Sequence, residues 1–448
     1  MGRLFGTDGV RGVANTILTP ELAFGLGQAA GIYFKQQKEG RPQLIIGKDT
    51  RISGDMLEAA LAAGLNSMGA DVVRLGVLPT PGVAYLCRAL QVDAGVMISA
   101  SHNPVADNGI KFFDSRGYKL TDESEDAIEA ILKGPVQTLE RPVGTGVGRI
   151  TDNPEAQNIY GDYLVSTVDQ SFKGLKVVVD CGYGAAFRLA PRIWRQLGAE
   201  VVALNDRADG ARINVGCGST HPEQLQQAVL EHRADLGVAH DGDADRVIAV
   251  DEAGQVVDGD QILTICGLAL LREGKLQNRK IAATVYSNLG LLEAFRNHGA
   301  EVTVTANGDR YVLAAMQEQG LILGGEQSGH IIFLEKNSTG DGILTALQLV
   351  AVMARTREKL SVLATQMRRY PQVLENVRVA NKEQWECNPA IQAAIRAGER
   401  RLEGRGRLLV RASGTEPLIR VMAEGPELKE LEMLVAAVAG TIRQAIGS

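Results

Sequence analysis

The sequence is poor in cysteine, which limits the cross-links and metal sites that it can form. Its 448 residues include five cysteines, an odd number, with no C-x-x-C pair and with long stretches between them. We therefore expect neither a disulfide framework nor a structural zinc site, and the pattern fits a reducing compartment. The five are Cys87, Cys181, Cys217, Cys266 and Cys387.

A long apolar run is also missing. No stretch of 18 or more apolar residues occurs, and one of the longest, 342–354, is interrupted by Thr and Gln. The start MGRLFGTDG has no apolar signal core, and Gly6 stands where an N-myristoylation signal requires Ser or Thr. We expect a cytoplasmic protein without a membrane partner.

Excess positive charge is lacking as well. The formal net charge is −6, whereas a nucleic-acid-binding protein usually carries a clustered basic face. One arginine-rich run, 396–411, is interleaved with Glu399 and Glu403, which is typical of a solvated surface. We therefore expect no nucleic-acid partner. The remaining composition is that of an ordinary globular protein, and the chain length predicts about three domains.

One sequence unit occurs three times. QLIIGKDT (43–50), GLKVVVDCGYGAA (174–186) and RKIAATVYSNLG (279–290) each read as a strand and a polar loop, followed by a helical stretch. Each helix then leads to a Gly-Ala-acid-Val segment that begins another strand, as at Gly69. Apolar β-branched strands and a glycine that ends the helix are typical of βαβ units. The repeat predicts three α/β domains of similar build.

The tail follows another pattern. A strand over 372–379 precedes a helix opened by Asn388-Pro389, a sound start signal. Two strands over 407–412 and 418–424 follow, then an amphipathic helix from Pro426. This βαββα order predicts a fourth, α+β domain.

The glycine-rich segment VGTGVG (143–148) is interpreted as a linker rather than a phosphate loop, because no helical pattern follows promptly. The predicted domains are 1–150 with a serine loop, 151–253 with an acidic loop, 254–368 with a glycine-flanked Glu/Ser loop and 369–448 with an arginine-flanked loop.

The first chemically suggestive loop is 99–108, within MISASHNPVADNGIKFF (97–113). Ser101 follows an apolar strand and precedes His102, and an exposed serine beside a basic ring is a candidate nucleophile. Ser, Asn and Pro are also common in ordinary turns, so a purely structural turn is the alternative.

The second loop, AHDGDADRVIAVDE (239–252), carries three alternating aspartates. In an extended loop Asp241, Asp243 and Asp245 face one side, where they would repel unless a cation holds them. Three hard oxygen donors suit Mg²⁺. An EF-hand would need glycine where Arg246 stands and a helix where VIAV reads as a strand. A phosphatase with Asp241 as nucleophile is the better alternative.

Two further loops carry groups that suit sugar phosphates. LGGEQSGH (323–330) presents Glu326 and Ser328 between glycines, which let the backbone approach a ligand. RASGTEPLIR (411–420) places hydroxyls and loop amides between two arginines, a set that fits a phosphate dianion. An ordinary turn and an arginine-bearing hairpin are the respective alternatives.

Together, these motifs resemble the α-D-phosphohexomutase family. FGTDGVRG (5–12), SASHNP, DGDADRV, GEQSGH and RASGTEPLIRV (411–421) occur in this order over almost the whole chain. The resemblance implies three related α/β domains with mixed sheets, plus a C-terminal α+β domain, around a central cleft. Ala244 stands where many relatives have glycine, a difference that removes no metal ligand.

The resemblance also implies residue roles. Ser101 would carry phosphate, and one Mg²⁺ per chain would be held by Asp241, Asp243, Asp245 and an oxygen of that phosphate. The groups around the transferred phosphoryl would be Arg11, His102, Lys111 and Arg246, with Lys111 or Arg11 handling the hydroxyl proton. The sugar would contact Glu326, Ser328 and His330. The non-reacting phosphate would be clamped by Arg411, Ser413, Gly414, Thr415 and Arg420.

The implied reaction interconverts glucosamine 6-phosphate and glucosamine 1-phosphate through a bisphosphate, supplying UDP-N-acetylglucosamine synthesis. GGEQSGH and FGTDGVRG resemble this amino-sugar branch, with phosphomannomutase or phosphoglucomutase activity as the alternative. An inactive sugar-phosphate-binding protein and an aspartyl-phosphate hydrolase remain as alternatives from other classes. The expected partner is a small hexosamine phosphate, and the expected state is a monomer or homodimer.

Overall fold

The computed structural model describes residues 3–6, 8–134, 140–413 and 417–447. They form two compact units. The larger comprises residues 1–286 and 301–366, and the smaller comprises 287–300 and 367–448. Because each unit has its own sheets and core, we describe them separately.

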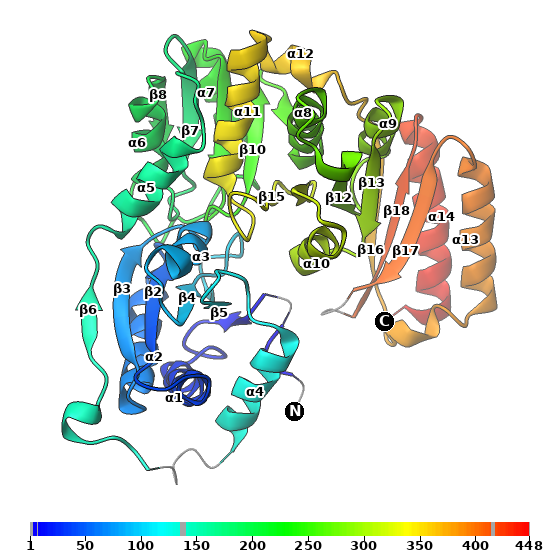
Figure 1. Ribbon diagram of the computed structural model, residues 1–448. Helices are drawn as coiled ribbons and strands as arrows, with labels where there is room; N and C mark the ends of the chain where they lie inside the picture. Colours follow the sequence, from blue (N-terminus) through cyan, green and yellow to red (C-terminus); the bar gives the residue numbers. More distant parts are fainter. Residues whose placement is uncertain (1–2, 7, 135–139, 414–416, 448) are drawn as a thin grey trace. The chain divides into compact units, whose positions relative to one another are not determined.

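The first sheet of the larger unit has the strand order β1-β5-β4-β2-β3-β6 (Figure 1). Its strands are β1 (Val10–Val13), β2 (Gln43–Lys48), β3 (Asp71–Val77), β4 (Ala94–Ile98), β5 (Asp107–Asp114) and β6 (Ile150–Asp152). The associated helices are α1 (Pro20–Gln36), α2 (Ser53–Ser67), α3 (Thr80–Ala89) and α4 (Asp122–Lys133). The central strands β2, β3 and β4 are parallel, and β5 is antiparallel to both of its neighbours.

Helices cover both faces of this sheet because β2 is apolar on both sides. Leu44 and Ile46 join the core beneath α1 and α2, while Gly47 lies against Val83 of α3. A strand buried on both faces reads as a continuous apolar run, as QLIIG does. The predicted linker contains a short 3₁₀ turn, Gly144–Gly146, and then adds β6 to the sheet edge.

The second sheet has the order β11-β10-β9-β7-β8. Its strands are β7 (Lys176–Asp180), β8 (Glu200–Leu204), β9 (Leu236–His240), β10 (Val247–Asp251) and β11 (Val256–Val257). The helices of this segment are α5 (Ala156–Ser166), α6 (Leu189–Gln196) and α7 (Glu223–His232). Strands β9 and β10 are antiparallel and buried throughout, so the loop that joins them begins and ends in the interior of the larger unit.

The third sheet has the order β13-β12-β14-β15. Its strands are β12 (Lys280–Thr284), β13 (Glu301–Thr305), β14 (Leu323–Gly325) and β15 (Ile331–Phe333). The helices nearby in sequence are α8 (Gly259–Arg272), η3 (Gln277–Arg279), α10 (Asp309–Gln319), α11 (Gly342–Thr356) and α12 (Leu360–Ala364). Asp258 caps α8 through a capping box with Gln261, which fixes where that helix begins.

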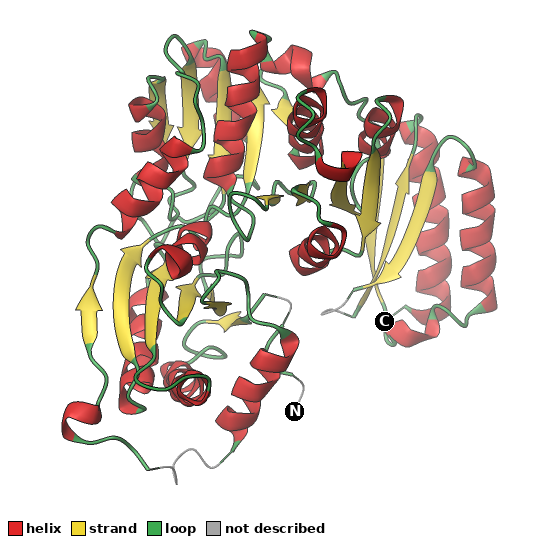
Figure 2. Ribbon diagram, viewed as in Figure 1, coloured by secondary structure: helices red, strands yellow, loops and turns green. Residues whose placement is uncertain are grey.

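The smaller unit is built on an antiparallel sheet of order β16-β18-β17 (Figure 2). Its elements are α9 (Leu289–Asn297), β16 (Gln372–Arg378), η4 (Lys382–Gln384), α13 (Pro389–Leu402), β17 (Arg407–Ala412), β18 (Leu418–Glu424) and α14 (Leu428–Ile446). Asn388 caps α13 with Pro389 at its first position, as predicted. The βαββα order is therefore confirmed.

The fold class is confirmed by the three repeats β2-α2-β3, β7-α6-β8 and β12-α9-β13, each with parallel strands. The third repeat has an unexpected feature, because α9 belongs to the smaller unit while β12 and β13 belong to the larger. Asn288 exchanges two hydrogen bonds with the backbone of Tyr370, and Leu289 N–H donates to Glu424 Oε1 at 2.8 Å. The division at 150, 253 and 368 stays a prediction.

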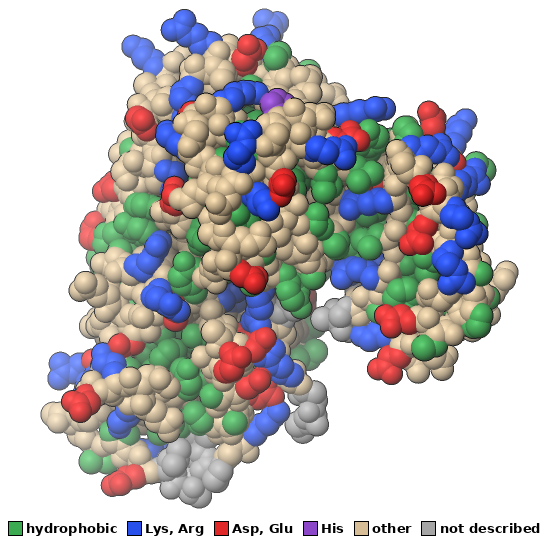
Figure 3. Space-filling view, turned by 45° about the vertical axis from the view of Figure 1, so that its right-hand side comes forward, with side chains coloured by type: hydrophobic (Ala, Val, Ile, Leu, Met, Phe, Trp, Pro, Cys, Tyr) green, Lys and Arg blue, Asp and Glu red, His purple; other side chains and the backbone are tan. Residues whose placement is uncertain are grey.

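Two features concern membrane and nucleic-acid partners. Within the described part of the chain, no helix is both long enough and apolar enough to cross a bilayer. On the face drawn in Figure 3, Lys and Arg side chains are interspersed with Asp and Glu.

Candidate functional site

Ser101 lies at the end of β4 in a tightly constrained loop. Its φ is 53°, in the left-handed region that non-glycine residues rarely occupy. Its carbonyl accepts hydrogen bonds from Arg51 Nη2 and Asn214 Nδ2, both at 2.9 Å, and its N–H donates to Ser99 Oγ at 2.9 Å. Strained backbone held in this way concentrates at functional sites, which favours chemistry over a plain turn.

The hydroxyl of Ser101 points at the acidic loop between β9 and β10. It donates to Asp241 Oδ2 at 2.6 Å and lies 3.3 Å from His102 Nδ1. Burial, together with the charges of Arg246 and Arg11, lowers the pKa of His102 to about 4. At neutral pH the ring is therefore uncharged, so it can exchange hydrogen bonds without adding positive charge.

The three aspartates converge, but for a different reason from the predicted one. Their loop is turned rather than extended, and Ala244 has a φ of 56°. A Cβ added at Gly242 would lie 2.6 Å from the carbonyl oxygen of Ser101, so only glycine lets the two loops approach. One carboxylate oxygen from each of Asp241, Asp243 and Asp245 lies within 4.8 Å of the others.

These carboxylates perturb one another. Burial raises the pKa of Asp241 well above its usual range, and the charges of Asp245 and Asp243 add to the rise. Burial likewise raises the pKa of Asp245, with Asp243 adding to it. Burial alone would raise the pKa of Asp243 too, but Lys111 and a hydrogen bond from Thr80 outweigh it and lower this pKa.

This triad fits a divalent cation. The side chains are almost entirely buried, and Asp243 Oδ1 and Asp245 Oδ1 have no hydrogen-bond partner among the described residues. Unpaired buried carboxylate oxygens are costly unless something neutralises them. Hard carboxylate oxygen donors are the ligands that Mg²⁺ prefers. The acidic cluster can therefore hold a metal ion.

A chain of ion pairs continues from Asp243. Lys111, on β5, lies 3.0 Å from Asp243 Oδ2 and 3.0 Å from Asp8 Oδ2. Arg11 also pairs with Asp8, whose other oxygen lies 2.5 Å from Lys119 Nζ. Burial would lower the pKa of Lys111, but Asp243 and Asp8 outweigh it and raise this pKa, so Lys111 is a cation beside Ser101's loop.

The predicted sugar loop joins β14 to β15 and adjoins the acidic loop. Arg246 and His330 form a β-bridge, and Val247 N–H donates to the carbonyl of Gly329 at 3.1 Å. Arg246 Nε lies 3.7 Å from Asp245 Oδ1. The sequence-predicted serine, acidic and sugar loops are thus brought together.

Within this turn, Glu326 is fixed by two donors. Its Oε1 accepts from Gly308 N–H at 3.1 Å and its Oε2 from Ser328 Oγ at 3.3 Å. His330 Nε2 lies between Asp245 Oδ2, at 3.9 Å, and Asp309 Oδ2, at 3.8 Å. The turn therefore presents a carboxylate and a hydroxyl next to the acidic triad.

The predicted phosphate clamp belongs to the smaller unit. Arg411 and Arg420 lie directly opposite each other across the β17–β18 hairpin, and Ser413 N–H donates to the carbonyl of Leu418 at 2.8 Å. Gly414 and Thr415 lie outside the described residues. The hairpin thus carries two like charges in register.

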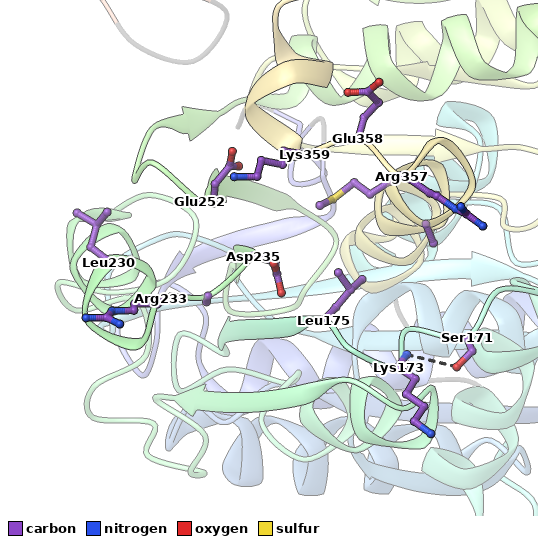
Figure 4. Close-up of a pocket in the computed structure, with 13 residues that line it drawn as sticks. Ser171, Lys173, Leu175, Leu230, Arg233, Asp235, Glu252, Arg357, Glu358 and Lys359 are labelled. Carbon is purple, nitrogen blue, oxygen red and sulfur yellow. Dashed lines mark hydrogen bonds between the residues drawn. The ribbon is translucent and has the colours of Figure 1, made fainter.

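A cavity of about 600 Å³ lies elsewhere in the larger unit (Figure 4). It is lined by apolar side chains such as Leu175 and Met353, with Lys173, Arg233 and Arg357 around them. None of the predicted site residues lines it. Glu252, the last residue of the 239–252 segment, borders this cavity, but Ser101 and the three aspartates do not.

Several site residues escaped the sequence reasoning. Asp8 stands inside the quoted motif FGTDGVRG, and Asp309 follows Asn-Gly at the start of α10, so both had a local signal. Lys119 and Thr80 had none, because only the fold brings Lys119 to Asp8 and Asp309, and Thr80 to Asp243. Long-range ion pairs are not visible in a single sequence.

A serine hydroxyl hydrogen-bonded to a buried acidic triad, with cations beside it, is typical of an enzyme of phosphoryl transfer, here on a multi-domain α/β fold. Models of the phosphoglucomutase/phosphomannomutase family match in order: α/β/α domain I over residues 2–138, domain II over 158–254, domain III over 258–370 and the C-terminal domain over 374–441. The chain belongs to this family. The predicted resemblance and the isomerase class are thereby confirmed.

Curated relatives cover nearly the whole chain. A phosphoglucosamine mutase of Symbiobacterium thermophilum is 58% identical over 444 residues, 99% of each protein. Another, of Carboxydothermus hydrogenoformans, is 55% identical over 99% of this chain and 100% of its own.

Solved structures share the fold. A phosphoglucomutase/phosphomannomutase family protein of Burkholderia thailandensis has a TM-score of 0.82 at 26% identity, covering 99% of this chain and 97% of its own. The N-acetylphosphoglucosamine mutase of Aspergillus fumigatus, in complex with GlcNAc-6P and magnesium, has a TM-score of 0.73 at 19% identity. It covers 99% of this chain and 96% of its own, and at this identity it supports the fold alone.

Proposed function

We propose that this chain interconverts glucosamine 6-phosphate and glucosamine 1-phosphate, supplying UDP-N-acetylglucosamine synthesis. Relatives named for this activity match over their full lengths at 53–58% identity. The observation that carries the mechanism is the 2.6 Å hydrogen bond from Ser101 Oγ to Asp241. This bond supports Ser101, beside the acidic triad, as the serine that carries phosphate.

The proposed transfer begins with phosphate on Ser101 Oγ. The O1 hydroxyl of glucosamine 6-phosphate attacks the phosphorus, the bond from phosphorus to Oγ breaks, and the hydroxyl proton passes to a base. The resulting bisphosphate reorients, Ser101 Oγ attacks the phosphorus at C6, the bond from phosphorus to O6 breaks, and O6 takes the proton held by the base. Glucosamine 1-phosphate then leaves, with phosphate again on Ser101. Phosphoryl transfer depends mainly on positioning and charge stabilisation, which the site residues provide.

Each residue type has a defined task in this scheme. Mg²⁺ held by Asp241, Asp243 and Asp245 would neutralise charge on the transferred group. Lys111, fixed between Asp8 and Asp243, supplies a second positive charge at the same place. Lys111 and Arg11 are the predicted groups for handling the hydroxyl proton, and Lys111, which is held as a cation, would donate a proton rather than accept one.

The remaining contacts bind rather than react. Glu326, Ser328 and His330 would hold sugar hydroxyls. In the hairpin, two guanidinium groups lie directly opposite each other, an arrangement that suits a phosphate dianion. This supports Arg411 and Arg420, with Ser413, Gly414 and Thr415, as a clamp for the phosphate that is not transferred.

The alternative of an aspartyl-phosphate hydrolase is less well supported. Ser101 is buried rather than exposed as predicted, so burial does not separate it from Asp241, but Asp241 Oδ2 is occupied by the Ser101 hydroxyl. A nucleophilic carboxylate would have to displace that hydroxyl to reach a phosphate. Ser101 is the better phosphate acceptor, because its hydroxyl reaches the triad and is not itself one of the three carboxylates.

Phosphopeptide mapping and substrate assays test the proposal together. We expect phosphate on Ser101 in the purified enzyme and loss of mutase activity in Ser101→Ala. Among the 6-phosphates of glucosamine, N-acetylglucosamine, glucose and mannose, the first should have the highest kcat/KM. Full activity of Ser101→Ala would contradict the mechanism, while higher kcat/KM with mannose 6-phosphate or glucose 6-phosphate would contradict the substrate.

A further inference from the structure

Glucosamine phosphates differ from glucose phosphates at carbon 2, where an amino group that is largely cationic near neutrality replaces a hydroxyl. Selecting the amino sugar therefore calls for an acceptor with negative charge, in reach of the sugar and not already saturated by protein donors. Glu326 meets this condition less well, because each of its oxygens already accepts one hydrogen bond, from Gly308 and Ser328, and its remaining acceptor positions are those assigned to sugar hydroxyls. Asp8 does not meet it, since Lys111, Lys119 and Arg11 occupy both of its oxygens.

Asp309 is different. Its Oδ2 lies 2.5 Å from Lys119 Nζ and 3.8 Å from His330 Nε2. No hydrogen bond or ion pair between described residues ends on its Oδ1. The side chain keeps 21% of its surface exposed, so the open oxygen is accessible to a ligand.

Asp309 lies beside the predicted sugar loop, where a bound sugar would come close to its side chain. It follows Gly308, whose N–H holds Glu326, and it opens α10. A single histidine ring atom, Nε2 of His330, stands between its carboxylate and that of Asp245 in the acidic triad. A sugar whose reacting oxygen lies at the triad, and whose hydroxyls contact Glu326, therefore has its ring within reach of Asp309.

The carboxylate of Asp309 is ionised near neutral pH. Burial alone would raise its pKa, but Lys119 and His330 outweigh burial and lower the pKa to about 2. Lys119 is shared with Asp8, so its single positive charge is divided between two carboxylates. The neighbouring Arg310 does not compete, because it pairs with Asp122 and Glu125.

We propose that Asp309 is the residue that selects the amino sugar, with its Oδ1 accepting a hydrogen bond from the 2-ammonium group of the substrate. This inference rests on the proposed function and names the contact behind its substrate preference. A hydroxyl at carbon 2 gains less from an ionised acceptor than an ammonium group does. The gain is therefore specific to glucosamine phosphates.

The test compares kcat/KM for glucosamine 6-phosphate and glucose 6-phosphate in the wild type and in Asp309→Asn, which keeps the shape and removes the charge. We expect the preference for glucosamine 6-phosphate to fall about tenfold or more, mainly through the glucosamine substrate. Asp162→Asn is the matched control, because it makes the same change at an exposed aspartate outside the predicted site. It should leave both kcat/KM values unchanged.

Binding measurements keep the test decisive if Asp309→Asn is inactive. Calorimetry on Ser101→Ala, with and without Asp309→Asn, should show weaker binding of glucosamine 6-phosphate and little change for glucose 6-phosphate. A wild type that prefers glucosamine 6-phosphate and an Asp309→Asn variant with the same preference would overturn the inference alone. A wild type without that preference would overturn the proposed function itself.

Discussion

Ser101 Oγ and Asp241 Oδ2 are joined by a 2.6 Å hydrogen bond, although 140 residues separate them in the chain. The bond brings the end of β4 in the first sheet to the end of β9 in the second. Neither sheet alone contains both the acceptor serine and the acidic triad. The larger unit must therefore fold across its sheets before this part of the site exists.

The close approach of these loops should make Gly242 indispensable. In Gly242→Ala, the new Cβ would lie 2.6 Å from the Ser101 carbonyl oxygen, so the serine loop must shift. A displacement of about 1 Å at a reacting centre costs about 10²-fold in rate, and we expect kcat to fall by that order.

The matched control for Gly242→Ala is Gly440→Ala, where an added Cβ meets nothing within 4 Å. Its kcat should remain that of the wild type. Circular dichroism and thermal melting of both variants will show whether the fold persists. An unchanged kcat in Gly242→Ala would show that the serine loop is not held as described.

The acidic triad should act as one metal site. Asp243→Asn removes a charge that the cation needs, and we expect kcat to fall about 10²-fold or more, with a weaker response to added Mg²⁺. Chelation of the wild-type enzyme should abolish activity, and Mg²⁺ should restore it.

A thermal-shift titration with Mg²⁺ provides a readout that does not depend on turnover. The wild type and Asp162→Asn, a substitution of an exposed aspartate, should be stabilised equally by Mg²⁺, whereas Asp243→Asn should respond less. Activity that survives thorough chelation would refute the metal site.

Arg420→Ala should weaken substrate binding rather than chemistry. The guanidinium would make charge-assisted hydrogen bonds to the phosphate that is not transferred, worth about 1.5–3 kcal/mol each. We expect KM to rise, with a smaller fall in kcat because the clamp also orients the sugar. Arg401→Ala, which removes only an exposed ion pair with Glu430, should leave KM unchanged. A wild-type KM in Arg420→Ala would contradict the clamp.

Buried thiols predict a pH dependence of both reactivity and stability. Burial raises the pKa of Cys87, Cys217 and Cys266 to about 12, whereas the reference value is 9.0. Because the folded pKa is the higher one, the stabilisation is complete below pH 9 and is lost as the pH rises through about 12. Urea unfolding between pH 8 and pH 11 should show this decline.

The same burial should make alkylation selective. At pH 8 in native conditions, iodoacetamide should modify only the exposed Cys387, and Cys387→Ser should be unreactive. After unfolding, all five thiols should react. Intact-mass spectrometry counts the additions, and more than one in the native protein would contradict the burial.

Much of the fold was predictable because local patterns agreed with it. The run QLIIGKDT is apolar on both faces, and Asn388-Pro389 opens α13 where the cap predicts. The convergence of the aspartates was predicted as well, although through an extended loop instead of the turn at Ala244. That difference arises because the left-handed φ of a residue depends on the packing around it, here the approach of Gly242 to Ser101.

Other parts of the site were beyond sequence reasoning. Lys119 and Asp309 are 190 residues apart, and each reads as an ordinary surface charge until the first and third sheets are assembled. The placement of α9 was equally hidden, because its sequence continues the βαβ repeat while its partners, such as Tyr370, lie about 80 residues further on.

The double entry of the chain into the smaller unit has a practical consequence. The chain passes into that unit at 286–287, returns at 300–301 and enters it again at 366–367. A fragment that begins at residue 367 would lack α9 and leave Glu424 without the N–H of Leu289. A fragment that ends at residue 366 would contain α9 but would lack Tyr370, whose backbone carbonyl accepts a hydrogen bond from Asn288. No single cleavage can therefore release either unit intact, and limited proteolysis at one of these crossings should leave a nicked protein whose pieces remain associated.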